Sequence, residues 1–281
     1  MRIRAVVFRI AVALGLLRPA VAWAGFPSDV PDRFQVQVGG TLAIMDTGAA
    51  LGPKSGAVSA VLVFEDFFNI PIHKDFAQFE GTWRFGARHS LDAGYVNIDR
   101  VGQRQIDSDV SFGRYTFHAG ATVEGRFASR FIYAAYRYDF FHEDRVRISG
   151  SAGISAERLV AGMSATGNIT DENGQAVSGE ASQEAKLPLP IPLLGLQLEW
   201  ALAPRIALQS YSRYIALNYA GIRGSQTVSA VRLYWYFSRN LGIGTGFDKV
   251  AISMPQYRTG DYTARFDYNI QGWSFYLRGA F

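Results

Sequence analysis

Residues 273–281 end the chain in a regular alternation that continues to the final residue. Counting back from the end, every second residue is Phe281, Gly279, Leu277, Phe275 and Trp273. The residues between them are small, polar or aromatic and include Arg278. A period of two places successive side chains on opposite faces of a β-strand. The sequence therefore predicts a terminal strand with one apolar face and one more polar face.

This ending resembles the closing strand of bacterial outer-membrane β-barrels. In that family the barrel-assembly machinery reads a C-terminal Phe that follows apolar residues at alternate positions. The resemblance implies that machinery as a partner, and it assigns the assembly signal to Trp273, Phe275, Leu277 and Phe281. Gly279 departs from the large residue usual at its position. The alternative is an amphipathic edge strand of a soluble β-protein.

The start of the chain has the features of a secretory signal peptide. Two arginines lie in residues 1–4, an apolar run follows at 10–17, and Ala22-Trp23-Ala24 fits a signal-peptidase site. We expect cleavage after Ala24 and an exported barrel over 25–281. A short anchor helix is the alternative, but the apolar run is too short to span a bilayer.

Composition limits the classes of function. The chain has 28 Lys+Arg and 24 Asp+Glu, and the signal contains four of the arginines and no acid. The exported part is therefore formally neutral, and we expect no nucleic-acid partner. There is no cysteine, which excludes disulfides and thiolate metal sites. We expect no cofactor.

Aromatic residues precede four short turns, and each turn has a basic residue in it or beside it. These turns lie near Arg88, Asp144, Arg205 and Arg239. Aromatics beside short turns are typical of the interfacial girdle at the periplasmic rim of membrane barrels. The other connections are longer, with outward loops expected near 46–74, 99–120 and 163–185.

The pattern predicts an all-β fold, an antiparallel transmembrane β-barrel in the outer membrane of a Gram-negative bacterium, with lipid around it. We expect ten strands, with residues 58–68 as an outer hairpin above the membrane. If that segment crosses instead with another strand, the barrel has twelve. The expected crossings are 33–45, 75–86, 89–101, 121–138, 145–160, 186–201, 205–219, 226–238, 241–254 and 261–281.

The chain also resembles an uncharacterised group of proteobacterial outer-membrane barrel proteins. The matching pieces are residues 65–70, Trp83-Arg84-Phe85 with Arg88-His89, Tyr136-Arg137-Tyr138, and residues 187–200. The resemblance covers most of the exported chain. It implies a barrel and no activity.

Strand alternation places both signs of charge inside the predicted barrel. A narrow barrel can be filled by side chains, and charges of both signs at similar depth predict ion pairs with shared hydrogen bonds. We expect a packed polar lumen; the alternative is a narrow solute path. The expected lumen charge network consists of Glu80, Arg84, Arg137, Asp139, Arg147, Glu199, Arg232, Asp248 and Arg278.

No catalytic residues are predicted. Outer-membrane phospholipases and lipid A deacylases resemble one another in a His-x-Ser pair on a strand. None of His73, His89, His118 and His142 has Ser two residues later. The histidines are too dispersed for a metal site, and we lean against an enzyme.

Pro188, Pro190 and Pro192 alternate in one predicted strand. Their missing N–H groups would all point toward the same neighbouring strand, and prolines occur at edges or where pairing stops. One interpretation is a segment above the membrane that peels away from the sheet. The functional hypothesis is a lateral seam between strands that admits a lipid or an apolar solute.

Together these patterns favour a structural role, or an interaction role through loops whose extracellular partner is unknown. One alternative is a porin-like narrow channel or lateral-gate transporter of small or apolar solutes. Another is a lipid-modifying outer-membrane enzyme.

Overall fold

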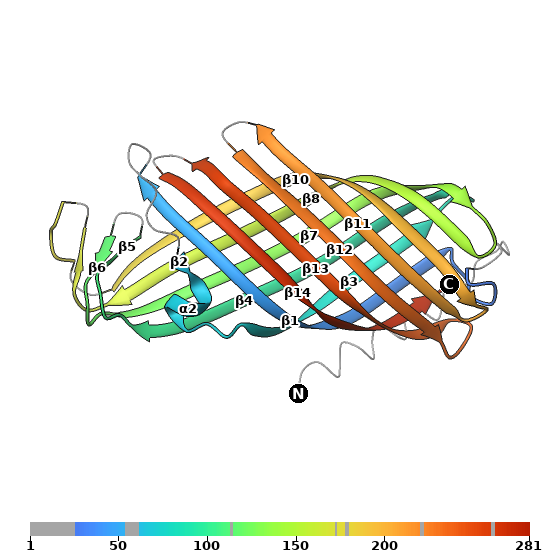
Figure 1. The fold of residues 1–281 in the computed structure, drawn as a ribbon, viewed down its shortest axis with the longest axis horizontal. Coiled ribbons are helices and arrows are strands. Elements are labelled where there is room, and N and C mark those ends of the chain that lie inside the picture. The colour runs from blue at the N-terminus through green and yellow to red at the C-terminus, as the bar shows by residue number, and fades with distance from the viewer. Residues whose placement is uncertain are drawn as a thin grey trace.

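Ten long antiparallel strands form a closed barrel in the computed structural model (Figure 1). The structure describes residues 26–53, 62–112, 115–171, 173–177, 180–219, 222–259 and 262–281, so the expected signal peptide lies outside them. Each strand pairs with its sequence neighbour among the ten, and the last pairs with the first. The prediction of ten strands is confirmed. The strands are β1 (Phe34–Pro53), β3 (His73–Arg84), β4 (His89–Gln105), β7 (Thr122–His142), β8 (Val146–Thr166), β10 (Glu180–Ala203), β11 (Ile206–Tyr219), β12 (Ile222–Tyr236), β13 (Leu241–Thr259) and β14 (Tyr262–Ala280).

The two ends of the described chain meet at one rim of the barrel. The ladder between β1 and β14 runs from Gln35 opposite Ala280 to Pro53 opposite Tyr262. Phe34 and Phe281 exchange backbone hydrogen bonds of 2.8 Å in both directions. The short turns after β3, β7, β10 and β12 lie at this same rim, as the even strand number requires.

The barrel exterior is apolar because alternate residues of each strand point outward. Exposed aromatic side chains gather near the short-turn rim, which is the arrangement of an interfacial girdle. They include Trp83, Phe85, Tyr136, Tyr138, Trp200, Trp235 and Phe237. No helix among the described residues is long and apolar enough to span a bilayer.

The strands extend further from the short-turn rim than the sequence pattern indicated. Much of the expected loop ranges 46–74, 99–120 and 163–185 is strand, because small and polar residues continue the ladders. A separate sheet of β5 (Val110–Phe112), β6 (Tyr115–Phe117) and β9 (Ile169–Thr170) lies beyond the barrel at this far end (Figure 1).

The prediction of an outer hairpin at 58–68 is wrong for the described part of that range, which forms a two-residue strand and a short helix. Residues 58–61 lie outside the described chain, and β2 (Leu62–Val63) pairs briefly with β1. The following residues form a short helix, α2 (Phe64–Phe68), whose two terminal Phe side chains are buried. Burial of these aromatic rings inside the barrel mouth is favoured over exposing them in a hairpin.

The barrel wall divides at its far end. Pairing of β10 with β11 stops at Leu194 opposite Tyr214, although both strands continue beyond that point. Pairing of β3 with β4 likewise stops at Gln78 opposite Val96. In Figure 1, β4, β7, β8 and β10 lean away from the group of β11 to β14 and β1.

Candidate functional site

The lumen has two layers of different chemistry. The half near the short-turn rim is polar and charged, with six arginines and six carboxylates: Arg84, Arg137, Arg147, Arg213, Arg232, Arg278, Asp32, Glu80, Asp92, Asp139, Glu199 and Asp248. The far half is largely a hydrophobic cluster, and it also encloses the ion pair of Arg100 with Glu65. The cluster includes Met45, Phe127, Leu159, Ile252 and Phe266. An unpaired charge in an interior with little water is costly, so we expect the arginines and carboxylates of this half to form ion pairs.

Arg232 is the centre of one ion cluster. Its guanidinium nitrogens donate to both carboxylate oxygens of Glu80, at 2.7 and 3.0 Å, and to Asp248 Oδ1 at 3.0 and 2.7 Å. Arg232 is 1% exposed and also lies over the ring of Tyr276, 4.6 Å from the centroid. Tyr276 donates to Asp248 Oδ2 at 2.6 Å. The two carboxylates thus share one buried cation.

A second cluster lies closer to the rim and joins the consecutive strands β3, β4, β7, β8 and β10. Arg84 Nη1 donates to Asp139 at 2.7 Å, and Ser149 Oγ donates to the other oxygen of Asp139 at 2.7 Å. Arg137 contacts Asp92 at 3.2 Å and Glu199 at 3.1 Å. The contacts of Arg84 with Asp139 and of Arg137 with Glu199 are hydrogen bonds, whereas Arg137 and Asp92 form an ion pair without one. All have little solvent access, and they hold the wall in one register.

Each of the nine predicted lumen residues lies inside the barrel, and eight of them form ion pairs there. Arg278 instead stacks on Tyr234, 4.1 Å from the ring centroid, and donates to Gln35. The sequence reasoning missed Asp92 and Arg213, although both have the inward parity of their strands. It also missed Asp32, which no strand pattern could identify because it precedes β1.

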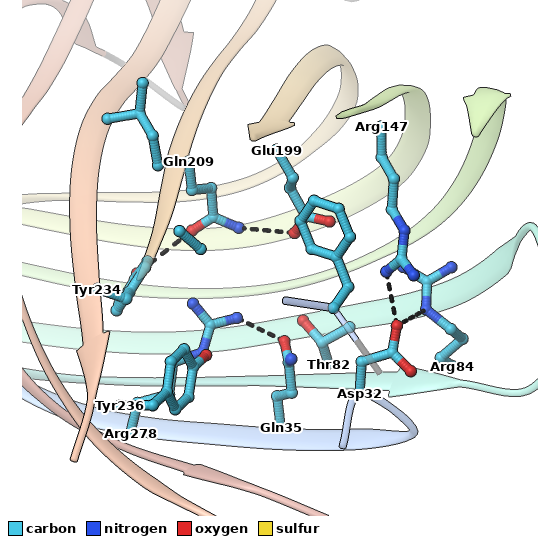
Figure 2. Close-up of a pocket in the computed structure, with 13 residues that line it drawn as sticks. Asp32, Gln35, Thr82, Arg84, Arg147, Glu199, Gln209, Tyr234, Tyr236 and Arg278 are labelled. Carbon is cyan, nitrogen blue, oxygen red and sulfur yellow. Dashed lines mark hydrogen bonds and ion pairs between the residues drawn. The ribbon is translucent and has the colours of Figure 1, made fainter. Parts of the chain in front are cut away.

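Asp32 belongs to a segment that closes the rim of the barrel. It accepts from Arg147 at 2.6 Å and lies 3.3 Å from Arg84, between β3 and β8 (Figure 2). Phe26 lies 4.2 Å beneath the Arg147 guanidinium, and Val30 packs with lumen tyrosines. The cavity that remains here has a volume of about 10 Å³, room for roughly one water.

Helix α2 closes the far half. Phe64 and Phe68 are fully buried, and Glu65 accepts from Arg100 at 2.5 Å. Gly125 makes room for this helix, because a Cβ there would lie 2.2 Å from the Phe68 ring. The lumen is therefore filled from rim to mouth along the described chain.

The three prolines lie where the wall divides. Pairing of β10 with β8 continues unbroken from Glu180 to Trp200. Because proline cannot donate, the hydrogen bonds of that ladder come from the alternate residues. The nitrogens of Pro188, Pro190 and Pro192 therefore face the β11 side, where pairing ends at Leu194. The segment peels away from β11 and stays with β8.

His118 lies in a hydrogen-bonded cluster on the far-end cap. Its Nδ1 is 2.8 Å from Asp109 Oδ2 and its Nε2 is 3.0 Å from Thr170 Oγ1. The backbone N–H of Ala119 donates to Asp109 Oδ1 at 2.9 Å, and this bond with the His118 contact lowers the pKa of Asp109. The order hydroxyl, imidazole, carboxylate is that of a hydrolase triad. In this fold the cluster connects β6 to β9.

The remaining predicted features are the residues of the assembly signal and the histidines. Trp273, Phe275 and Leu277 point outward from β14. His89 contacts Tyr136 Oη at 2.6 Å near the short-turn rim. Within the described ranges, no group of three His, Asp or Glu side chains could hold a metal ion.

Similarity to known proteins is confined to the fold. No protein-family model matches the chain, and no curated protein matches it. The outer-membrane protease OmpT from Escherichia coli is similar over 89% of this chain and 97% of its own, with a TM-score of 0.56 at 14% identity. The toluene transporter TodX from Pseudomonas putida has a TM-score of 0.35 at 8% identity, covering 92% and 91% of the chains. OprG from Pseudomonas aeruginosa gives 0.35 at 7% identity, covering 89% and 98%. The likeness to OmpT, together with the closed ten-stranded sheet, shows an outer-membrane type of barrel fold.

Proposed function

We propose that the chain is an exported outer-membrane β-barrel that does not conduct solutes and acts through its extracellular end. The observation that supports this proposal is the filled lumen, with ion clusters in one half and an apolar core in the other. The segment containing Asp32 blocks the rim, and α2 blocks the mouth. A conducting state would have to expel both and separate buried ion pairs, which is costly.

The extracellular end contains the parts suited to contact a partner. The strands continue beyond the apolar band, and the β5–β6–β9 sheet lies beyond them, with β6 and β9 connected by the His118 cluster. Long loops on a rigid barrel are a common place for binding surfaces. The role is structural, or one of interaction through this end.

Two measurements test the proposal separately. Electrophoresis of outer-membrane fractions, unheated and boiled, should show the mobility shift of a closed barrel. Planar-bilayer recording of the purified protein should show no discrete current steps, while a general porin in the same bilayers supplies the positive control. Regular steps that scale with protein added would refute the closed lumen and leave the membrane location standing.

A second candidate function is a lateral gate between β10 and β11. It is favoured by one observation, the end of their ladder at Leu194 and Tyr214 beside the three prolines. Apolar solutes or lipid chains could enter there without crossing the polar half of the lumen.

Engineered disulfides test this candidate directly, because the chain has no cysteine of its own. Pro192→Cys with Ala216→Cys spans the seam two residues beyond the last pair, Leu194 with Tyr214. Leu196→Cys with Ser212→Cys is the matched pair two residues inside the ladder. The second pair should oxidise readily and the first slowly. Equal rates would mean a closed wall and would end the gate hypothesis.

A further inference from the structure

Two arginines lie side by side on the outer surface of the barrel. Arg130 on β7 is directly opposite Arg158 on β8, and both side chains are exposed. Residues opposite each other in an antiparallel pair have Cβ atoms about 5 Å apart, and like charges there are unfavourable. Asn97 lies opposite Arg130 on its other side. The row Asn97, Arg130, Arg158 therefore presents only hydrogen-bond donors and one amide oxygen.

This pair lacks the carboxylates that form ion pairs with Arg84, Arg137, Arg147 and Arg232 in the lumen. Among the described residues, no ion pair involves Arg130 or Arg158. The next outward arginine on β7, Arg126, differs because it donates two hydrogen bonds, of 2.7 and 3.1 Å, to the carboxylate of Asp99. The carboxylate of Asp99, which lies near Arg130, is therefore already paired with Arg126. Glu124 lies one further step toward the far end on the same face.

The height of the pair on the wall places it at a membrane boundary. Arg130 is eight residues from Tyr138, which belongs to the aromatic girdle near the rim. At about 3.4 Å per residue and a tilt near 40°, the separation along the barrel axis is roughly 20 Å. The apolar band of such barrels is roughly 25 Å tall, so the backbone of the pair lies about 5 Å inside its outer edge. A long arginine side chain can extend over that distance and place its guanidinium at the interface. Ile132 and Ile154, on the rim side, are exposed to the apolar band.

We infer that Arg130 and Arg158, with Asn97, bind a phosphate group of the outer-leaflet glycolipid. The ligand is a lipid phosphate because the site faces outward from the wall near the outer edge of the apolar band, from which the guanidinium groups extend to the lipid headgroups. Guanidinium groups recognise phosphate with paired, charge-assisted hydrogen bonds, and an anion between them removes the repulsion that their register creates. The inference goes beyond the closed-barrel function and depends only on the membrane location.

The test compares lipids that differ only in phosphate. Purified barrel in detergent is mixed with bis-phosphorylated lipid A or with the same lipid after enzymatic dephosphorylation, and the bound lipid is counted by native mass spectrometry. We expect at least about tenfold preference for the phosphorylated form. Arg130→Gln with Arg158→Gln should reduce its binding to the level of the dephosphorylated form, and Arg130→Lys with Arg158→Lys should keep most of it.

Arg88→Gln with Arg239→Gln is the matched control, because it removes two exposed arginines at the opposite rim. Each variant must first show the heat-dependent mobility shift of a folded barrel. Equal binding of the two lipids, or unchanged binding by the Gln variant, would overturn the site. Displacement of the lipid by millimolar inorganic phosphate would overturn its assignment to a lipid.

Discussion

Removing the guanidinium of Arg232 should destabilise the barrel strongly. Arg232→Met keeps much of the side-chain volume but leaves Glu80 and Asp248 without their shared cation. Each carboxylate keeps a neutral donor, Gln37 at 2.7 Å for Glu80 and Tyr276 at 2.6 Å for Asp248. Two acids then face one another in a part of the lumen with little water.

The expected loss of unfolding free energy is about 3–5 kcal/mol, the usual cost of breaking a buried pair by removing one partner. With a urea dependence near 2 kcal/mol per molar, the unfolding midpoint should fall by roughly 2 M. Equilibrium urea unfolding in lipid vesicles measures this shift. It is followed by the fluorescence of the four tryptophans of the exported chain, Trp83, Trp200, Trp235 and Trp273.

Two comparison variants make the reasoning refutable. Glu80→Gln with Asp248→Asn and Arg232→Met removes the whole ion cluster and should recover most of the loss, because no charge is left unpaired. Arg265→Met breaks an exposed pair with Asp267 and should cost about 1 kcal/mol or less. If the single Arg232 variant is as stable as the Arg265 variant, or the triple variant is no better than the single, the explanation by unpaired charge is wrong.

Three further changes have definite expected outcomes. Gly125→Ala drives a methyl into the Phe68 ring and should cost about 1–3 kcal/mol; urea midpoints should show that the same change is nearly neutral once Phe68→Ala has removed the ring. Asp32→Asn weakens the pairing of two buried arginines and should cost about 3 kcal/mol; limited trypsin digestion should then cut before β1, and an unchanged digestion pattern would contradict the rim closure. The folded-state pKa of Asp109 is lowered, so its carboxylate stabilises the cap above the unfolded pKa and this stabilisation is lost as pH falls through the folded pKa. The protection factor of the Ala119 amide against hydrogen exchange, corrected for the intrinsic rate at each pH, should therefore fall on acidification, and Asp109→Asn should remove that pH dependence.

Strand alternation predicted the inward and outward faces because the pleat imposes a strict period of two. That period placed Glu80 and Arg232 in the lumen. The alternation could not predict that Glu80 and Arg232 contact each other, because they are 152 residues apart in the sequence. Their contact depends on the stagger in strand register with which the sheet closes into a barrel. Asp32 escaped prediction because it follows no strand pattern, and α2 escaped because five residues are too few to show a helical period.

The divided wall leaves one edge of β10 unpaired over residues 180–193. A free strand edge is a template on which another chain can add a strand, and such addition leads to aggregation. Here three successive positions whose nitrogens face the open side are Pro188, Pro190 and Pro192. An incoming strand would find no N–H donor at any of them. The same prolines that end the ladder therefore protect the barrel from sheet-to-sheet polymerisation with its own copies.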